Sequence, residues 1–124
     1  TPLPTNTPMP PAISINSVLN EFTAAGIQLN DISLNPPLDA NSPLPRSFNQ
    51  HAFWNDALLG DKGGQIFICN EPAHCQALSA YFTALVALAG PYTYTSPSGL
   101  IVIQLNSAFT PEQAERYKAA IQKF

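Results

Sequence analysis

The chain has 124 residues, of which 45% are hydrophobic and only 10% charged, with a formal net charge of −3 and a pI near 5.0. This length suits a single domain with its own core. The acidic balance argues against a nucleic-acid partner, which requires a basic face. No apolar run approaches the roughly 18–20 residues of a membrane-spanning helix.

The first twelve residues predict an extended tether in front of one domain over residues 13–124. Five of the first eleven residues are proline, and such a segment adopts a semi-rigid polyproline conformation. It resembles the tether that follows the lipidated cysteine in exported bacterial lipoproteins, although that cysteine does not occur in it. The resemblance implies a membrane-surface anchor. The segment itself either packs on its own domain or lies against a partner chain. The prolines are therefore interface candidates: Pro2, Pro4, Pro8, Pro10 and Pro11.

The front half of the domain predicts a helix over residues 13–26, a strand over 27–34 and a second strand near 47–54. Ser14 is a suitable N-cap, and Gly26 stands where a left-handed residue ends a helix. Apolar residues in 27–34 change phase near Asp31, which predicts a β-bulge. The proline-rich stretch 35–45 predicts a loop, and the 47–54 strand is expected at an edge of the sheet.

The second half predicts a strand over 65–69, a helix over 71–89, a hairpin of 92–95 with 100–105, and a last helix. Asn70 is the expected N-cap of the first of these helices, and Gly90-Pro91 ends it. The run 100–103 is apolar on both faces, so that strand should be central. Thr110-Pro111-Glu112-Gln113 is a capping box that begins the last helix.

These elements follow the order α-β-β-β-α-β-β-α. Residues 65–124 supply much of a ferredoxin-like α/β plait, and the 27–34 strand could provide its missing edge. The sequence therefore predicts an α+β fold with a mostly antiparallel sheet and helices on one face.

Cys69 and Cys75 are the most specific local feature. One ends a strand and the other lies in the first turn of the following helix, so a disulfide is geometrically easy. Five residues separate them, unlike the two of thioredoxin-type motifs, yet a redox pair next to His74 remains an alternative. A metal site would use these cysteines with His74, His51 and Met9, but paired ligand spacing is missing, and no metal or cofactor is expected.

Catalytic groups are scarce, because no Asp, Glu, Lys or Arg occurs between Pro72 and Phe109. Asp56 and Asp61 flank a loop, and nothing near them in the sequence indicates burial that would raise the pKa of a carboxyl group. No nucleophile or phosphate-binding motif is present. Tyr92 and Tyr94 either fill the core or form an exposed, uncharged interface.

We therefore expect a non-catalytic, extracytoplasmic domain that serves as an accessory subunit of a membrane-bound complex. Low charge and a cysteine pair favour an oxidising compartment such as the periplasm or cell surface. Two alternatives stay open: a small redox or metal-handling protein that uses Cys69, Cys75 and His74, and a binder of a small or carbohydrate ligand on an aromatic sheet face.

Overall fold

The computed structural model describes residues 13–36, 41, 44–46 and 48–124. The proline-rich tether and its five candidate interface prolines lie outside the described residues. The described elements, in chain order, are α1 (Ile15–Ala24), β1 (Leu29–Leu34), β2 (Phe48–Asp56), β3 (Gly63–Cys69), α2 (Pro72–Ala84), α3 (Val86–Ala89), β4 (Thr93–Thr95), β5 (Ile101–Leu105) and α4 (Pro111–Ile121).

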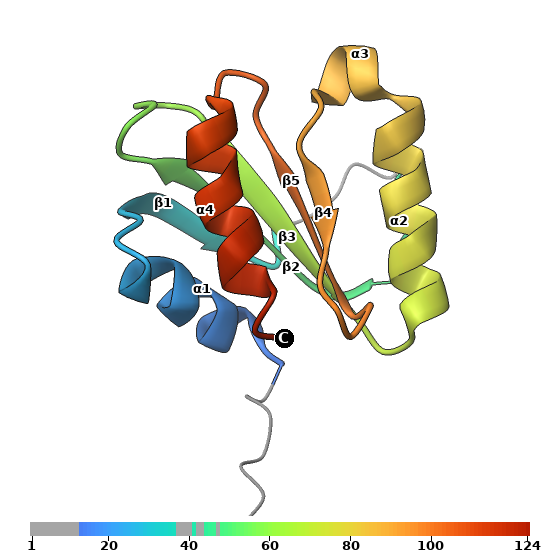
Figure 1. The fold of residues 1–124 in the computed structure, drawn as a ribbon. Helices are drawn as coiled ribbons and strands as arrows, with labels where there is room; N and C mark the ends of the chain where they lie inside the picture. The colour runs from blue at the N-terminus through green and yellow to red at the C-terminus, as the bar shows by residue number, and fades with distance from the viewer. Residues whose placement is uncertain (1–12, 37–40, 42–43, 47) are drawn as a thin grey trace, which may run out of the picture.

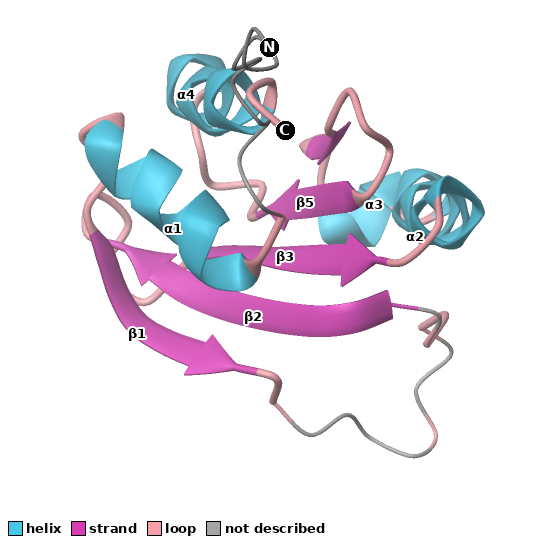
Figure 2. Cartoon of the chain, turned by 90° about the horizontal axis from the view of Figure 1, so that it is seen from below, coloured by secondary structure: helices cyan, strands magenta, loops and turns pink. Residues whose placement is uncertain are grey.

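The five strands form one antiparallel sheet in the order β1-β2-β3-β5-β4 (Figures 1 and 2). This confirms the α+β class and the predicted element order, with the short α3 following α2. β3 and β4 flank β5 and are joined through α2, which is the strand arrangement of a plait. β5 is central as expected, and every one of its residues is buried.

The helices pack on both faces of the sheet, whereas the sequence predicted them on one. Adjacent residues of a strand point to opposite faces. Ile101 and Ile103 join the core cluster of α1 and α4, while Val102, between them, joins a second cluster with α2. In Figure 1 the strands β4 and β5 accordingly run between α4 and α2. A sheet whose central strands are apolar on both faces needs helices on both to exclude water.

The predicted edge strand near residues 47–54 is an inner strand. β2 pairs with β3 on one side and with β1 on the other, so β1 forms the edge. The predicted bulge in β1 is confirmed, because its register with β2 shifts between Asn30 and Ser33 and Asp31 has a φ of 52°. β1 therefore extends the sheet beyond β2 instead of completing the plait against β3.

The helix ends agree with the sequence in two of three cases. The Ser14 side chain caps α1, Gly26 follows it with a φ of 85°, and Thr110 with Gln113 forms the predicted capping box of α4. The third expectation is wrong, because the N-cap residue of α2 is Glu71 and its side chain makes no cap hydrogen bond. The Asn70 carboxamide instead accepts a hydrogen bond from the Asn49 side chain of the neighbouring strand.

A buried polar network crosses the core beneath α4. The Trp54 indole N–H donates to the Tyr117 hydroxyl at 3.1 Å, and that hydroxyl donates to the Asp56 carboxylate at 2.6 Å. The other carboxylate oxygen of Asp56 accepts from the backbone N–H of Leu58 at 2.8 Å. All three side chains of the network are at most 3% exposed. The sequence placed Asp56 beside a loop without a buried context, and the structure corrects this.

This network is structural, because each polar group in it already has a partner. Phe22 of α1 packs edge-on against the Tyr117 ring and tilted against Trp54, so the network joins α1, β2 and α4. Burial is the main cause that raises the pKa of Tyr117, and the hydrogen bond to Asp56 raises it further. The phenol therefore stays protonated and keeps donating to the carboxylate.

None of the described helices combines the length and the apolar composition that crossing a bilayer would take.

Candidate functional site

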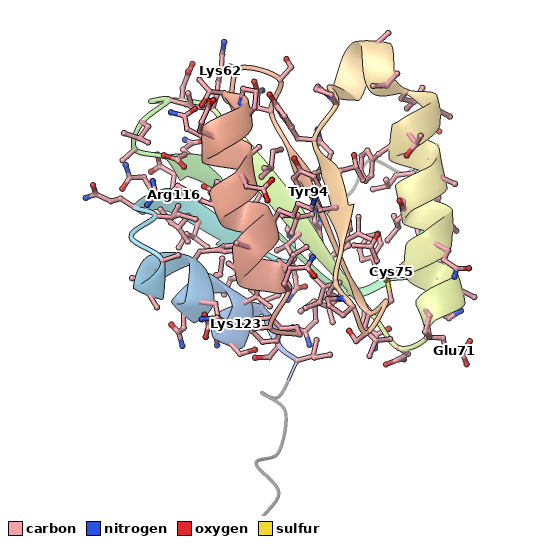
Figure 3. The ribbon with its side chains drawn as sticks, in the orientation of Figure 1. Lys62, Glu71, Cys75, Tyr94, Arg116 and Lys123 are labelled. Carbon is pink, nitrogen blue, oxygen red and sulfur yellow. A yellow bond between two sulfur atoms is a disulfide. The ribbon has the colours of Figure 1, made fainter. Side chains whose placement is uncertain are left out.

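Cys69 and Cys75 form the predicted disulfide between the end of β3 and the first turn of α2, with their Cα atoms 5.8 Å apart. Figure 3 shows Cys75 at the N-terminal end of α2. The two residues are 4% and 0% exposed and pack with Phe67, Leu78 and Val102. Exchange requires a thiolate to reach a sulfur atom, so this burial favours a structural bond over a redox centre.

The two histidines occupy different surroundings. His51 is buried in β2, with its ring stacked on Phe67, whereas His74 lies in the first turn of α2 at 3.6 Å from Glu71. Among the described residues, no three His, Cys, Asp or Glu side chains gather into a possible metal site. Met9 lies outside the described residues.

The α2 side of the sheet is only partly covered by its helix. Directly paired residues of antiparallel strands point to the same face. The row of His51, Phe67 and Val102 therefore shares one face, and its Phe67 and Val102 pack against α2. The next row on this face joins Phe53, Gln65, Gln104 and Thr93, and there the Phe53 side chain is 42% exposed. The second row is therefore accessible to a ligand at Phe53, whereas Gln104 in the same row is buried.

A chain of hydrogen bonds connects the two rows. The His51 Nε2 atom lies 2.9 Å from the Gln65 Oε1 atom, and the Gln65 amide nitrogen donates to Gln104 at 3.0 Å. The Gln104 amide nitrogen then donates to the backbone carbonyl of Leu105 at 2.8 Å. The Leu105 carbonyl can only accept, so the amide nitrogen of Gln104 must face it and the Gln104 oxygen must face Gln65. The Gln65 nitrogen then faces Gln104, and the Gln65 oxygen faces His51. His51 must therefore carry its proton on Nε2.

This tautomer leaves the His51 Nδ1 atom as a buried acceptor with no hydrogen-bond partner in the described structure. Burial lowers the pKa of His51 below its ordinary value of 6.5, although the hydrogen bond to Gln65 opposes the shift. The neutral ring stacks on Phe67 with the ring centroids 4.3 Å apart. His51 is therefore a neutral, fixed donor that orients Gln65 at physiological pH.

We expect the protein to lose stability as the pH falls below about 6.5, since the unfolded chain then binds a proton at His51 that the folded chain resists. Above pH 6.5 the ring is neutral in both states, so the stability is undiminished. Below pH 6.5 the free energy of unfolding should fall by at most about 1.4 kcal/mol for each pH unit. Urea unfolding at pH 7.5 and pH 5.0 measures it. His51→Phe keeps a ring on Phe67 and should flatten the dependence. An equal slope in this variant and the wild type would contradict the assignment.

The second row borders a cavity of about 330 Å³ at the ends of β3 and β5. Its lining combines an aromatic ring, three carboxamides, a hydroxyl and bare backbone. The residues are Phe53, Gly63, Gln65, Gln104, Asn106 and Ser107, with the edges of Trp54 and Gly64. None of these side chains is ionisable. Charged and metal-binding residues are the usual sequence signals of a site, and this neutral group of side chains gives none of them, so the sequence did not predict it.

Glycine is required at position 63 by a close approach of the backbone. A Cβ atom there would overlap the carbonyl group of Trp54 on the paired strand. Gly63 also accepts a hydrogen bond at its carbonyl from the Asn106 N–H at 2.9 Å, which holds the residue after β5 beside the start of β3. The two strand ends thus form the floor of the cavity.

Tyr92 and Tyr94, the candidate interface tyrosines, are half-buried and pack against the core cluster of α1 and α4. Tyr94, labelled in Figure 3, is paired with Ile103. The Lys118 ammonium lies 5.6 Å from the centre of its ring. Thr93 points to the opposite face, in the row of Gln104. The tyrosines therefore lie on the α4 side of the sheet, against the core, and a partner surface at these tyrosines stays a prediction.

Exposed apolar side chains concentrate at the β1 side of the molecule. Five large apolar side chains in the described structure are more than 40% exposed, namely Ile32, Leu34, Phe53, Leu58 and Val86. Four of them belong to β1, β2 or the turn after β2, and only Val86 lies in α3. Ile32 also lines a groove of about 380 Å³ between the end of α1 and β1. This surface was not predicted from the sequence.

No protein-family model matches the chain, and comparisons with curated proteins and with solved structures find no match.

Proposed function

We propose that this chain is a non-catalytic, extracytoplasmic domain that docks as an accessory subunit on a larger membrane-associated complex. The observation that carries the proposal is the exposed apolar surface of the edge strand β1. Ile32 and Leu34 are 45% and 53% exposed there. Apolar side chains gathered on one surface, next to a groove, mark a contact for another protein.

The geometry of β1 favours contact of its side chains with a partner protein. It disfavours the alternative, in which a strand of the partner pairs with the β1 backbone and extends the sheet. An edge strand offers unpaired backbone groups, but a bulge twists and interrupts that edge. Here the bulge at Asp31 lies in the middle of β1, and the Asp31 carboxylate accepts a hydrogen bond from Asn55 at 3.1 Å. Leu34 pairs with Ala52 and so points to the α1 face, where Ile32 lines the groove. The partner surface should therefore be apolar and should contact this face.

The chemistry of the disulfide supports the extracytoplasmic location. A buried disulfide that joins β3 to α2 is typical of proteins that fold in an oxidising compartment. The proline-rich segment supports attachment to a membrane surface through its resemblance to lipoprotein tethers. In this proposal the tether holds the domain near the membrane, and β1 selects the partner.

We expect Leu34→Lys to weaken association with the native complex at least about tenfold, because a charge would have to be buried in the contact. The side chain is exposed, so the unfolding free energy should change by less than about 0.5 kcal/mol. Co-sedimentation with native membrane extracts measures the association. Val86→Lys is the matched control, since Val86 is 52% exposed but lies in α3 near the opposite edge of the sheet (Figure 1).

A photo-crosslinking amino acid placed at position 34 or 86 gives a second readout. The proposal requires a discrete crosslinked product from position 34 and none from position 86. It is wrong if the native protein sediments as a lone monomer of 13.3 kDa, or if both lysine variants associate like the wild type.

A further inference from the structure

We propose that the cavity beside Phe53 is a binding site for a neutral carbohydrate unit, separate from the docking surface on β1. Phe53 and Ser33 are paired and point to the α2 face, whereas Leu34 and Ala52 point to the α1 face. The cavity therefore opens on the side of the sheet opposite Leu34. This binding function is additional to the accessory role and does not depend on it.

The residues that line the cavity include no charged side chain. Phe53, Gln65, Gln104, Asn106 and Ser107 supply an aromatic ring, carboxamides and a hydroxyl. An anionic ligand would find no cation there, and a cationic ligand would find no carboxylate. A wholly apolar ligand would cover the second amide hydrogen of Gln65 and the amide group of Asn106 without accepting a hydrogen bond from either, which costs free energy. The remaining class is a neutral ligand with several hydrogen-bonding groups.

The amide donors of Gln65 and Asn106 are held in place before a ligand binds. The Gln65 amide nitrogen carries two hydrogens and uses one on Gln104, so the other can be donated to a ligand. The Asn106 side-chain oxygen accepts from the Ala108 N–H at 2.8 Å, which turns its amide nitrogen into the available donor. Because His51 fixes the orientation of Gln65, the cavity presents N–H donors to ligand oxygen atoms.

The exposed ring of Phe53 offers an apolar surface to a ligand. Phe53 is 42% exposed and has no aromatic partner among the described residues. A pyranose ring has an apolar face that covers such a ring and an equatorial belt of hydroxyl groups that accept from amides. The cavity of about 330 Å³ lies at the small end of the usual range for small-molecule sites, about 300–1,000 Å³. It therefore has room for one or two sugar units.

The test is titration of the disulfide-bonded protein, followed through the side-chain amide signals of Gln65, Gln104 and Asn106 by NMR. The probes are glucose, N-acetylglucosamine and the β-1,4-linked trimer of each. We expect saturable shifts with at least one probe and a dissociation constant of about 0.1–10 mM, as befits a shallow neutral site. If none of the four sugars shifts these signals at 50 mM, the proposal is wrong.

Two substitutions at the exposed ring make the test specific. Phe53→Leu keeps an apolar side chain without the ring and should weaken sugar binding at least about fivefold, whereas Phe53→Tyr keeps the ring and should bind within twofold. Equal binding by Phe53→Leu and the wild type would overturn the proposal. Thermal unfolding of both variants shows that each is folded, since position 53 is exposed.

A peptide ligand is the competing outcome. A synthetic peptide with the sequence of residues 1–11 is added in place of the sugars. Shifts with this peptide and none with the sugars would show that the ring and the amides bind a polypeptide, which would overturn the carbohydrate assignment. The Leu34→Lys variant should bind sugar like the wild type, so failure of the docking proposal and failure of this one can be told apart.

Discussion

Replacing Tyr117 with phenylalanine is expected to lower the free energy of unfolding by about 2–4 kcal/mol, although it removes a single oxygen atom. That oxygen accepts from the Trp54 indole and donates to Asp56, and all three side chains are buried. Its removal leaves a buried N–H and a buried carboxylate oxygen each without this partner. Each such group costs about 1–3 kcal/mol. Urea unfolding followed by circular dichroism measures the loss.

The matched control for this variant is Tyr94→Phe. Tyr94 is a half-buried tyrosine of β4 whose ring lies beneath Lys118, and its ring would be kept. We expect a change of less than about 0.5 kcal/mol there. A loss below 1 kcal/mol for Tyr117→Phe would mean that water replaces the hydroxyl, and the network would then not stabilise the junction of α1, β2 and α4.

The second large effect is expected from the disulfide. Replacing both Cys69 and Cys75 with alanine should lower the free energy of unfolding by roughly 2–3 kcal/mol, because the bond closes a short loop in the unfolded chain. The wild type in reductant strong enough to open the buried bond should behave like the double variant. If the double variant is as stable as the oxidised wild type, the bond does not contribute to stability.

Removal of the disulfide should destabilise mainly the N-terminal end of α2. α2 begins without a side-chain cap and without an acidic residue in its first turn, so the bond is the main constraint at its N-terminal end. α4 has a complete capping box and provides an internal control. Hydrogen exchange should therefore accelerate in the first turns of α2 more than in α4. Uniform acceleration of both helices would contradict this localised role.

The local elements of this protein were largely readable from the sequence. The Ser14 cap, the capping box at Thr110, the bulge at Asp31 and the left-handed Gly26 depend on the chemistry of a few neighbouring residues. The Cys69–Cys75 disulfide was readable for the same reason, because a strand end and the following helical turn are close in every such unit. The apolar run in β5 likewise predicted a central strand.

What the sequence could not decide depends on contacts between distant residues. Asp56 and Tyr117 are 61 positions apart, and nothing near Asp56 in the chain indicates that a phenol would cover it. The cap of α2 was misplaced because Asn70 bonds with Asn49, on the neighbouring strand, instead of with its own helix. The face covered by each helix likewise depends on packing between distant residues, since Ile101 and Ile103 pack with α1 and α4 while Val102 packs with α2.

The stretch from Gly63 to Thr110 illustrates this division. The sequence alone determined its strand, helix and hairpin and its lack of charge, because these follow from composition and local spacing. Only the tertiary structure decided what that lack of charge means. α2 and α4 cover opposite faces of β3 and β5, and antiparallel pairing aligns Phe53, Gln65 and Gln104 in one row that is exposed at Phe53. That row exists because strand register joins residues that are far apart in the chain.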